Sequence, residues 1–466
     1  MSRWLITVFL TLGCALLANS AVARTPFSDL TLRDLQAVHD ILAENHPGPV
    51  DRRNPGFRVW LEQGLASGLT EAETVSDLPG YRRAMLRYVN GFRDGHIALS
   101  LRADTLSRTW PGFTVRLDND GQFRVGVTET ADAPLGAVVR ECDDAGLMPR
   151  FDTEIAPLYW NADIPHERPY PTPRLFFFEV DERRPRTCLL EIDGSERHVT
   201  LSWHTISRAI ASEQTRAALG RVTLNLGIRE LAGVTFVSLP NMNATGKDEF
   251  FAELEARRDA LRQARLLVLD VRGNSGGSSA VGERALSILF GQDLVGRISE
   301  SFDWTVDWRA SPGNAEELRR QARADDGDLP REIDAAIGRG DDFVRRSGSP
   351  VRLRGRAPLT PFRGDVFLLT DGACASACLD FADIARRLPR VMHVGQPTSG
   401  DAIYIDNRQQ PLPSGLAALS FGMKVYRNRV RGHNQWYAPA LQWPGGAMTD
   451  EAVAAWLVDL ASRGTR

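Results

Sequence analysis

The chain has 466 residues, of which 43% are hydrophobic and 25% are charged. It is long enough to bury a large core and too long for one ordinary domain, so we expect two or three domains. Its 59 acidic and 56 basic residues leave a net charge of −3, which excludes the basic footprint of a nucleic-acid-binding protein.

Residues 1–23 have the pattern of a secretory signal peptide. Arg3 provides a basic start, residues 5–18 form an apolar run, and the triplet A-V-A at 21–23 matches a cleavage site. An uncleaved anchor and a lipoprotein signal at Cys14 are the alternatives, but the apolar run is short for a membrane span. No later stretch is long enough to cross a bilayer. We therefore expect a periplasmic or secreted protein without stable membrane insertion.

Residues 24–102 are predicted to form an N-terminal helical region. An amphipathic helix over residues 28–44 would begin with a capping box of Thr31 and Asp34, and a second helical stretch covers residues 56–92. The segment that follows, R-D-G-H-I-A-L-S-L, predicts a turn that leads into a strand. His96 lies at the start of that strand.

A small β-rich domain is expected over residues 103–205. Short runs with alternating apolar residues are separated by D-N-D-G and I-D-G-S, which are hairpin signals. The even number of cysteines after residue 23 favours disulfides in an oxidising compartment. A bond between Cys142 and Cys188 would join neighbouring strands of this domain.

Residues 206–466 contain two strand-turn-helix units. The first, L-L-V-L-D-V-R-G-N-S-G-G at 266–277, ends an apolar strand in a glycine-rich turn. The glycines leave backbone N–H groups bare at a helix start, where such groups point at negative charge. We expect Asp270 and Arg272 to brace this turn.

The second unit reads V-F-L-L-T-D-G-A-C-A-S-A-C-L-D at 366–380. It places Ser376 where a strand has ended and a helix begins, which exposes a hydroxyl beside free amides. One turn thus offers the oxyanion donors, Gly276 or Gly277 together with Ala377, and the other turn offers a nucleophile.

Two segments near these units have alternative interpretations. Cys374 and Cys378 flank Ser376, and a disulfide between them would staple the turn; two buried thiols are the alternative. The polar, arginine-rich insertion over residues 291–359 is either a lid over the site or an addition to the surface.

The two units resemble the tail-specific (C-terminal processing) protease family. The pattern D-x-R-G-N-x-G-G, followed by T-x-x-x-x-x-S-A at the head of a helix, carries the resemblance, which runs from about residue 232 to residue 423. It implies an α/β fold with a crotonase-like (ClpP-like) spiral core. It also implies that residues 103–205 are a degenerate PDZ-like domain.

The base that activates Ser376 depends on the branch of that family. In the branch with a serine–lysine dyad, a lysine ends a T-x-G-K turn, and here Asp401 holds that position. The chain has only Lys247 and Lys424, and both are expected to be exposed, which disfavours a dyad. The Ser-His branch, similar to the tricorn protease core, takes its histidine from the segment before the β-rich domain, where His96 fits.

Two further roles have competing candidates. His393 is the main alternative base, although its apolar neighbours in a strand favour a buried role. Asp401 is expected to orient the histidine, with Asp94 and Asp406 as alternatives, because a triad needs a third group behind its base.

The residues and the resemblance together predict a serine-type peptidase. It would hydrolyse peptide or protein substrates through an acyl-enzyme on Ser376, with His96 as general base and without a metal or organic cofactor. One alternative is a non-proteolytic protein of the same fold that binds a hydrophobic ligand or a peptide. Another is an esterase or amidase for small molecules.

Overall fold

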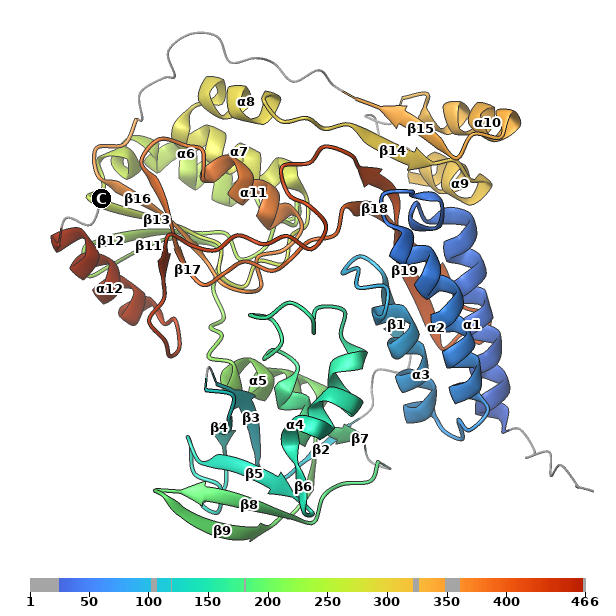
Figure 1. Cartoon of the computed structure of the whole chain (residues 1–466). Coiled ribbons are helices and arrows are strands. Elements are labelled where there is room, and N and C mark those ends of the chain that lie inside the picture. The colour runs from blue at the N-terminus through green and yellow to red at the C-terminus, as the bar shows by residue number, and fades with distance from the viewer. Residues whose placement is uncertain are drawn as a thin grey trace, which may run out of the picture.

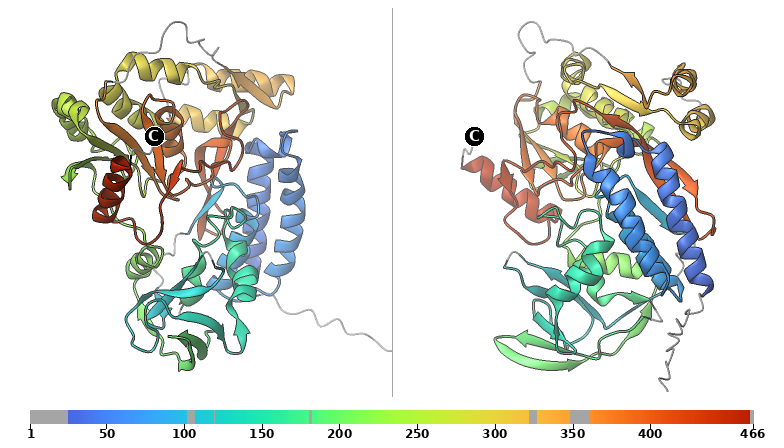
Figure 2. Two further views of the ribbon diagram at one scale, coloured as in Figure 1. Left: turned by 60° about the vertical axis from the view of Figure 1, so that its left-hand side comes forward. Right: turned by 45° about the vertical axis from the view of Figure 1, so that its right-hand side comes forward.

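The structure, a computed structural model, describes residues 25–101, 107–118, 120–179, 182–321, 327–347 and 361–463. The predicted signal peptide and Cys14 lie outside these residues. Figures 1 and 2 show helices arranged around and beside four β-sheets, which is the mixed α/β fold that was expected. Among the described helices, none combines the length and the apolar character that a membrane span requires.

Three helices form the N-terminal region (blue in Figure 1): α1 (Pro26–Asn45), α2 (Pro55–Ala72) and α3 (Leu78–Asn90). Their apolar faces pack on β19 (Ala417–Tyr426), which buries Leu419 and Phe421 among them. The strand after α3, β1 (Ala98–Leu101), pairs antiparallel with β19. The region therefore shares a core and a sheet with the C-terminal part of the chain.

The start of α1 differs from the prediction. Thr25 caps the helix by accepting the N–H of Ser28, and Pro26 occupies the first turn, where its missing N–H costs nothing. The expected capping box is wrong, because Thr31 donates to a backbone carbonyl of the preceding turn and Asp34 accepts a buried tyrosine hydroxyl from α3.

The β-rich part has a sheet in the order β3-β4-β5-β8-β9, with β6 beside β5. Its strands are β3 (Phe113–Leu117), β4 (Phe123–Thr128), β5 (Val138–Cys142), β6 (Ala145–Gly146), β8 (Thr187–Ile192) and β9 (Ser195–Thr200). Cys142 and Cys188 face each other on β5 and β8 and form the predicted disulfide. A smaller sheet has the order β10 (His204–Ile206), β2 (Arg108–Trp110), β7 (Phe178–Glu179).

Residues 147–176 of this part contain short helical segments joined by turns, although the sequence predicted short strands with turns. The segments are α4 (Leu147–Arg150), a π-helical turn (Phe151–Ile155) and two 3₁₀ turns (Ala156–Leu158 and Thr172–Phe176). They pack Phe151, Leu175 and Phe176 into the core of the β-rich part. Helix α5 (Arg208–Ala218) then leads to the next sheet.

The central sheet has the order β11-β12-β13-β16-β17-β20. Its strands are β11 (Gly227–Leu231), β12 (Val234–Ser238), β13 (Leu266–Asp270), β16 (Asp365–Thr370), β17 (Val391–Gly395) and β20 (Leu441–Gln442). β11 runs antiparallel to β12, and the following pairs are parallel. The parallel arrangement brings the carboxyl ends of β13 and β16 to the same edge.

Helices cover both faces of this sheet (Figure 1). One face packs on α12 (Asp450–Ser462) and the other on α6 (Asp248–Gln263), α7 (Ser279–Phe290), α8 (Gln292–Glu300) and α11 (Ala377–Ala385). Side chains alternate along β13: Leu266 and Val268 lie with α12, while Leu267 and Leu269 lie with α6 and α7. Burial on both faces explains the continuous apolar runs in the sequence.

The insertion after α8 contains β14 (Val306–Arg309), α9 (Pro312–Gln321), α10 (Leu329–Arg339) and β15 (Phe343–Arg346). β14 pairs with β19, and β15 extends that sheet, which β18 (Tyr404–Pro411) completes. Trp308 is buried in a core that the insertion shares with Met423 of β19. The described part of the insertion is thus built into a sheet, and residues 348–359 lie outside the described chain.

Candidate active site

The two predicted turns lie side by side, because β13 and β16 are parallel neighbours. Asp371 joins the turns: its Oδ1 accepts the N–H of Gly273 and the N–H of Ala373, both at 3.0 Å. Burial raises the pKa of this aspartate, and the two amide donors oppose that shift. A second link runs from the N–H of Ala375 to the carbonyl of Asn274.

Ser376 is the residue that precedes α11, and its backbone has φ 54° and ψ −123°. A residue other than glycine is rarely found at positive φ, and such strain of about 1–3 kcal/mol persists where the surrounding structure enforces it. The Ser376 hydroxyl makes no hydrogen bond to the described part of the chain. This geometry presents a free hydroxyl at a helix start, as the sequence predicted.

Gly276 lies directly against Ser376. A Cβ atom on Gly276 would stand 2.8 Å from the Ser376 Cβ and 2.9 Å from the carbonyl oxygen of Ala375. The N–H of Gly276 donates to Oδ1 of Asn274 at 2.9 Å, so Gly276 supplies space beside the nucleophile. Within the described residues, the amides of Gly277 and Ala377 make no hydrogen bond, which leaves them as the available oxyanion donors.

His96 enters the site on the turn before β1. Oδ1 of Asp94 accepts the N–H of His96 at 2.8 Å, and burial raises the pKa of Asp94. Nε2 of His96 lies 3.7 Å from Oδ1 of Asp401, so the structure brings together two of the predicted residues. No hydrogen bond joins His96 to Ser376 in the described structure.

An ion network connects Asp401 to the helix that Ser376 begins. Arg429 donates to Oδ2 of Asp401 at 2.9 Å and also contacts Asp380, which lies in the first turn of α11. Arg431 donates to Asp380 at 2.8 Å and to Asp383 at 3.2 Å. Burial alone would raise the pKa of Asp380, but the two guanidinium groups hold it below the ordinary value.

The structure places the competing candidates elsewhere. Asp406 pairs with Lys424 at 2.8 Å. His393 is buried, with Nε2 2.8 Å from the hydroxyl of Thr370, and burial lowers its pKa to about 4, assisted by Arg386. Its burial and its hydrogen bond to Thr370 support the interpretation of His393 as a structural residue.

The expectation that both lysines are exposed is wrong. Lys424 forms its ion pair with Asp406 and lies 4.6 Å above the ring of Trp308. Lys247 is only 3% exposed and donates to Oδ1 of Asn241 at 3.0 Å. Neighbouring segments cover both side chains, which the sequence around each lysine did not indicate.

Two histidines that the sequence left without a role lie behind His96. His46 is fully buried, with Nε2 3.8 Å from Oδ2 of Asp94. Burial lowers the pKa of His46 well below its usual value, and the nearby His433 and His96 add to the shift. The imidazoles of His46, His96 and His433 therefore lie close to one buried carboxyl group, that of Asp94.

The β-rich part also reaches the site. Glu167 is 1% exposed and accepts the N–H of Gly400 at 2.7 Å, and His166 lies 2.8 Å from the carbonyl oxygen of Thr398. These contacts hold the turn that carries Asp401. They come from the turns between the two 3₁₀ segments, which the sequence did not predict.

Comparisons with known proteins show a family match for part of the chain and a similarity in fold. Residues 233–435 match the profile of peptidase family S41. No curated protein sequence matches the chain. A solved structure of mature CPAF complexed with lactacystin has 16% identity and a TM-score of 0.62, and the alignment covers 94% of this chain and 98% of that chain.

Two further structures give the range of this similarity. Mature CPAF in another crystal structure has 14% identity and a TM-score of 0.60, with 94% and 97% coverage of the two chains. The tricorn protease has 12% identity and a TM-score of 0.41, with 93% and 37% coverage. The CPAF alignments extend the similarity in fold beyond the matched region. Residues 233–435 of the chain therefore resemble peptidase family S41, in agreement with the predicted resemblance to the tail-specific proteases.

Proposed function

We propose that this chain is a secreted or periplasmic serine peptidase that cleaves peptide bonds through an acyl-enzyme on Ser376. The observation that carries the proposal is the nucleophile turn: a free serine hydroxyl at positive φ beside the available amides of Gly277 and Ala377. The proposal includes a crotonase-like core and a PDZ-like β-rich domain.

In the proposed first step, the Ser376 oxygen attacks the substrate carbonyl and its proton passes to His96. The oxyanion that forms would accept hydrogen bonds from Gly277 and Ala377, and each such donor contributes roughly 3 kcal/mol to transition-state stabilisation. His96 then protonates the leaving amine, and water hydrolyses the acyl-enzyme. The contact between His96 and Ser376 is assigned to the substrate complex, since catalytic hydrogen bonds often shorten on binding.

Asp401 would stabilise the imidazolium form of His96 across their 3.7 Å separation. Arg429 fixes the position of this carboxylate, and through Asp380 it also fixes the first turn of α11. The network therefore couples the base to the nucleophile helix. It supports Asp401 as the orienting residue over Asp406, whose carboxylate pairs with a lysine.

The proposed compartment rests on the cysteines and on the signal-like start of the chain. The disulfides Cys142–Cys188 and Cys374–Cys378 require an oxidising environment to form and persist. Expression with its native N-terminus, followed by N-terminal sequencing of the exported protein, should give a mature chain that begins at Arg24. A full-length protein retained in the cytoplasm would contradict the assignment.

Labelling with a fluorophosphonate probe tests the mechanism. The purified wild type should react, Ser376→Ala should not react, and His96→Ala should react at least about a hundredfold more slowly. His198→Ala, an exposed histidine on β9, is the matched control. A folded wild type that does not react would favour the ligand-binding alternative, and an unaffected His96→Ala would reassign the base. Cleavage of a peptide library separates a peptidase from a small-molecule esterase.

A further inference from the structure

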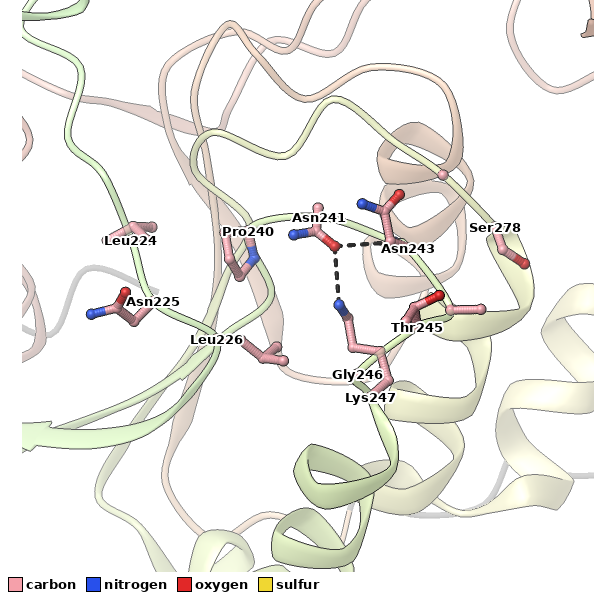
Figure 3. Close-up of a pocket in the computed structure, with 12 residues that line it drawn as sticks. Leu224, Asn225, Leu226, Pro240, Asn241, Asn243, Thr245, Gly246, Lys247 and Ser278 are labelled. Atoms are coloured by element: carbon pink, nitrogen blue, oxygen red, sulfur yellow. Dashed lines mark hydrogen bonds between the residues drawn. The ribbon is translucent and has the colours of Figure 1, made fainter. Parts of the chain in front are cut away.

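A pocket of about 630 Å³ opens beside the glycine turn (Figure 3). Its lining consists of Gly277 and Ser278, the adjacent loop from Pro240 to Lys247, and residues 224–226. Gly277 is one of the available oxyanion donors, and its neighbour Gly276 touches Ser376. A peptide held at the oxyanion turn would therefore have nearby atoms at the mouth of this pocket.

Lys247 is the one charged side chain among the lining residues. Figure 3 shows its ammonium group directed at Asn241, whose Oδ1 accepts one hydrogen bond from it at 3.0 Å. An ammonium group has three donors, and no described carboxylate lies within ion-pair distance of this one. Burial lowers the pKa of Lys247, and no neighbouring charge opposes the shift.

The second lysine of the chain provides a contrast. Lys424 has both an aspartate and an aromatic ring as partners. Buried lysines are almost always paired in this way, because an isolated ammonium group is costly to remove from water. The lysine without an acidic partner is thus the one that lines the pocket.

We propose that this pocket binds a carboxylate group of the substrate, with Lys247 as its counter-charge. The proposal rests on the proposed peptidase function, because it needs a peptide held at the oxyanion turn. A single ammonium group with an amide neighbour matches one negative charge. A phosphate dianion would leave one charge uncompensated, since the lining residues include no arginine. The carboxylate is either an acidic side chain near the cleaved bond or the free C-terminus.

Matched peptides test the proposal and identify the source of the carboxylate. One pair differs only by Glu against Gln near the cleaved bond, and a second pair differs only by a free or an amidated C-terminus. For one pair, the wild type should prefer the acid about tenfold to a hundredfold in kcat/KM, mainly through KM. The pair that shows the preference identifies the source.

Lys247→Met should reduce this preference to about one, while Lys424→Met should keep the wild-type ratio. Asn241→Asp is a second variant, because it places a carboxylate beside the ammonium group without removing the lysine; it should also abolish the preference. If Lys247 acted as the base, Lys247→Met would slow both peptides alike and keep their ratio, which would overturn the proposal.

Binding to Ser376→Ala separates this proposal from the proposed catalysis. Ser376→Ala should bind the acid peptide at least about tenfold more tightly than its amide counterpart. Ser376→Ala/Lys247→Met should bind the two peptides equally. Equal binding to Ser376→Ala in both peptide pairs would overturn the carboxylate site. A wild type that binds the acid selectively but fails to label would instead overturn the proposed function.

Discussion

The two strand-turn-helix units are neighbours in one sheet, but they are stabilised in different ways. The first turn, after β13, places its positive φ angles at glycines and is braced by buried charges, with Arg272 bonded to Asp270 and Asp450. The second turn, after β16, places a positive φ at Ser376 and is closed by the disulfide Cys374–Cys378. Asp270 and Arg272 thus brace the glycine turn, as predicted.

This difference matches the two chemical roles that we propose. A turn that only offers amides can use glycine, which adopts positive φ without strain. A turn that offers a nucleophile must carry a side chain at the strained position, so its surroundings have to enforce that conformation. We therefore expect changes in the first turn to alter stability or geometry, and changes around the second to alter reactivity more than stability.

The largest effect is expected from removing the charge that braces the first turn. Arg272 is 1% exposed, so Arg272→Met leaves a buried aspartate with fewer partners and should lower the free energy of unfolding by about 3–5 kcal/mol. Denaturant titration measures this loss. Arg331→Met is the control, because Arg331 forms a surface pair with Asp328 and should change stability by less than about 1 kcal/mol. Equal losses would show that the buried network does not brace the turn.

A change at the contact between the two units should affect reactivity. Gly276→Ala would place a Cβ 2.8 Å from the Ser376 Cβ, so the nucleophile turn must shift. We expect the fluorophosphonate reaction to slow at least about a hundredfold, equivalent to about 3 kcal/mol. Gly273→Ala is the matched control: it also has positive φ, but its Cβ would have no atom within 4 Å. It should cost about 1 kcal/mol of stability and little reactivity.

The sequence predicted the features that local contacts determine and missed those that depend on distant contacts. Both strand-turn-helix units could be predicted, because glycine spacing, apolar runs and the serine at a helix start are local signals. The pairing of β1 with β19 joins segments from opposite ends of the chain, and no local pattern specifies it. For this reason, the prediction that His96 and Asp401 belong to one site came from the family resemblance and not from a local pattern.

The residues that the sequence missed depend on such distant contacts as well. Arg429 and Arg431 lie in R-N-R-V-R, which reads as a solvated basic run until Asp380 and Asp401 are known to face it. Glu167 lies in a segment predicted as strands, yet it holds the turn before Asp401. The two lysines were predicted to be exposed because lysine side chains usually are. In the folded chain Lys424 pairs with an aspartate, and neighbouring segments cover Lys247.

A pH titration examines the strand beside the nucleophile turn. His393 holds Thr370, the last residue of β16, and its pKa is lowered from 6.5 to about 4. Because the folded pKa lies below the unfolded one, the unfolded state binds more protons between these values, and stability falls as the pH drops from about 6.5 to about 4. The loss is about 3 kcal/mol for this residue. It should level off below pH 4, where both states are protonated.

The variant His393→Gln keeps a donor for Thr370 and removes this titration, so its stability should depend less steeply on pH in that range. Some slope should remain, because burial also lowers the pKa of His46. His198→Gln is the matched exposed control. An unchanged slope in His393→Gln would mean that His393 does not titrate as a buried neutral residue.

A modest effect on stability, with a specific effect on reactivity, is expected from removing the disulfide around Ser376. Cys374 and Cys378 are four residues apart, whereas Cys142 and Cys188 are 46 apart. Because chain-entropy stabilisation grows with loop length, replacing the short bridge with two alanines should cost about 2 kcal/mol of stability, and replacing the long one should cost about 4 kcal/mol.

The rate of labelling should respond in the opposite order. It should be about tenfold slower without the short bridge, because Ser376 can relax from its positive φ, and unchanged without the long bridge. Thermal unfolding and the fluorophosphonate rate, measured on both double variants, decide this. If both measurements followed loop length, the short bridge would be a structural link only, and the network of Arg429 and Asp380 would be what holds the nucleophile turn.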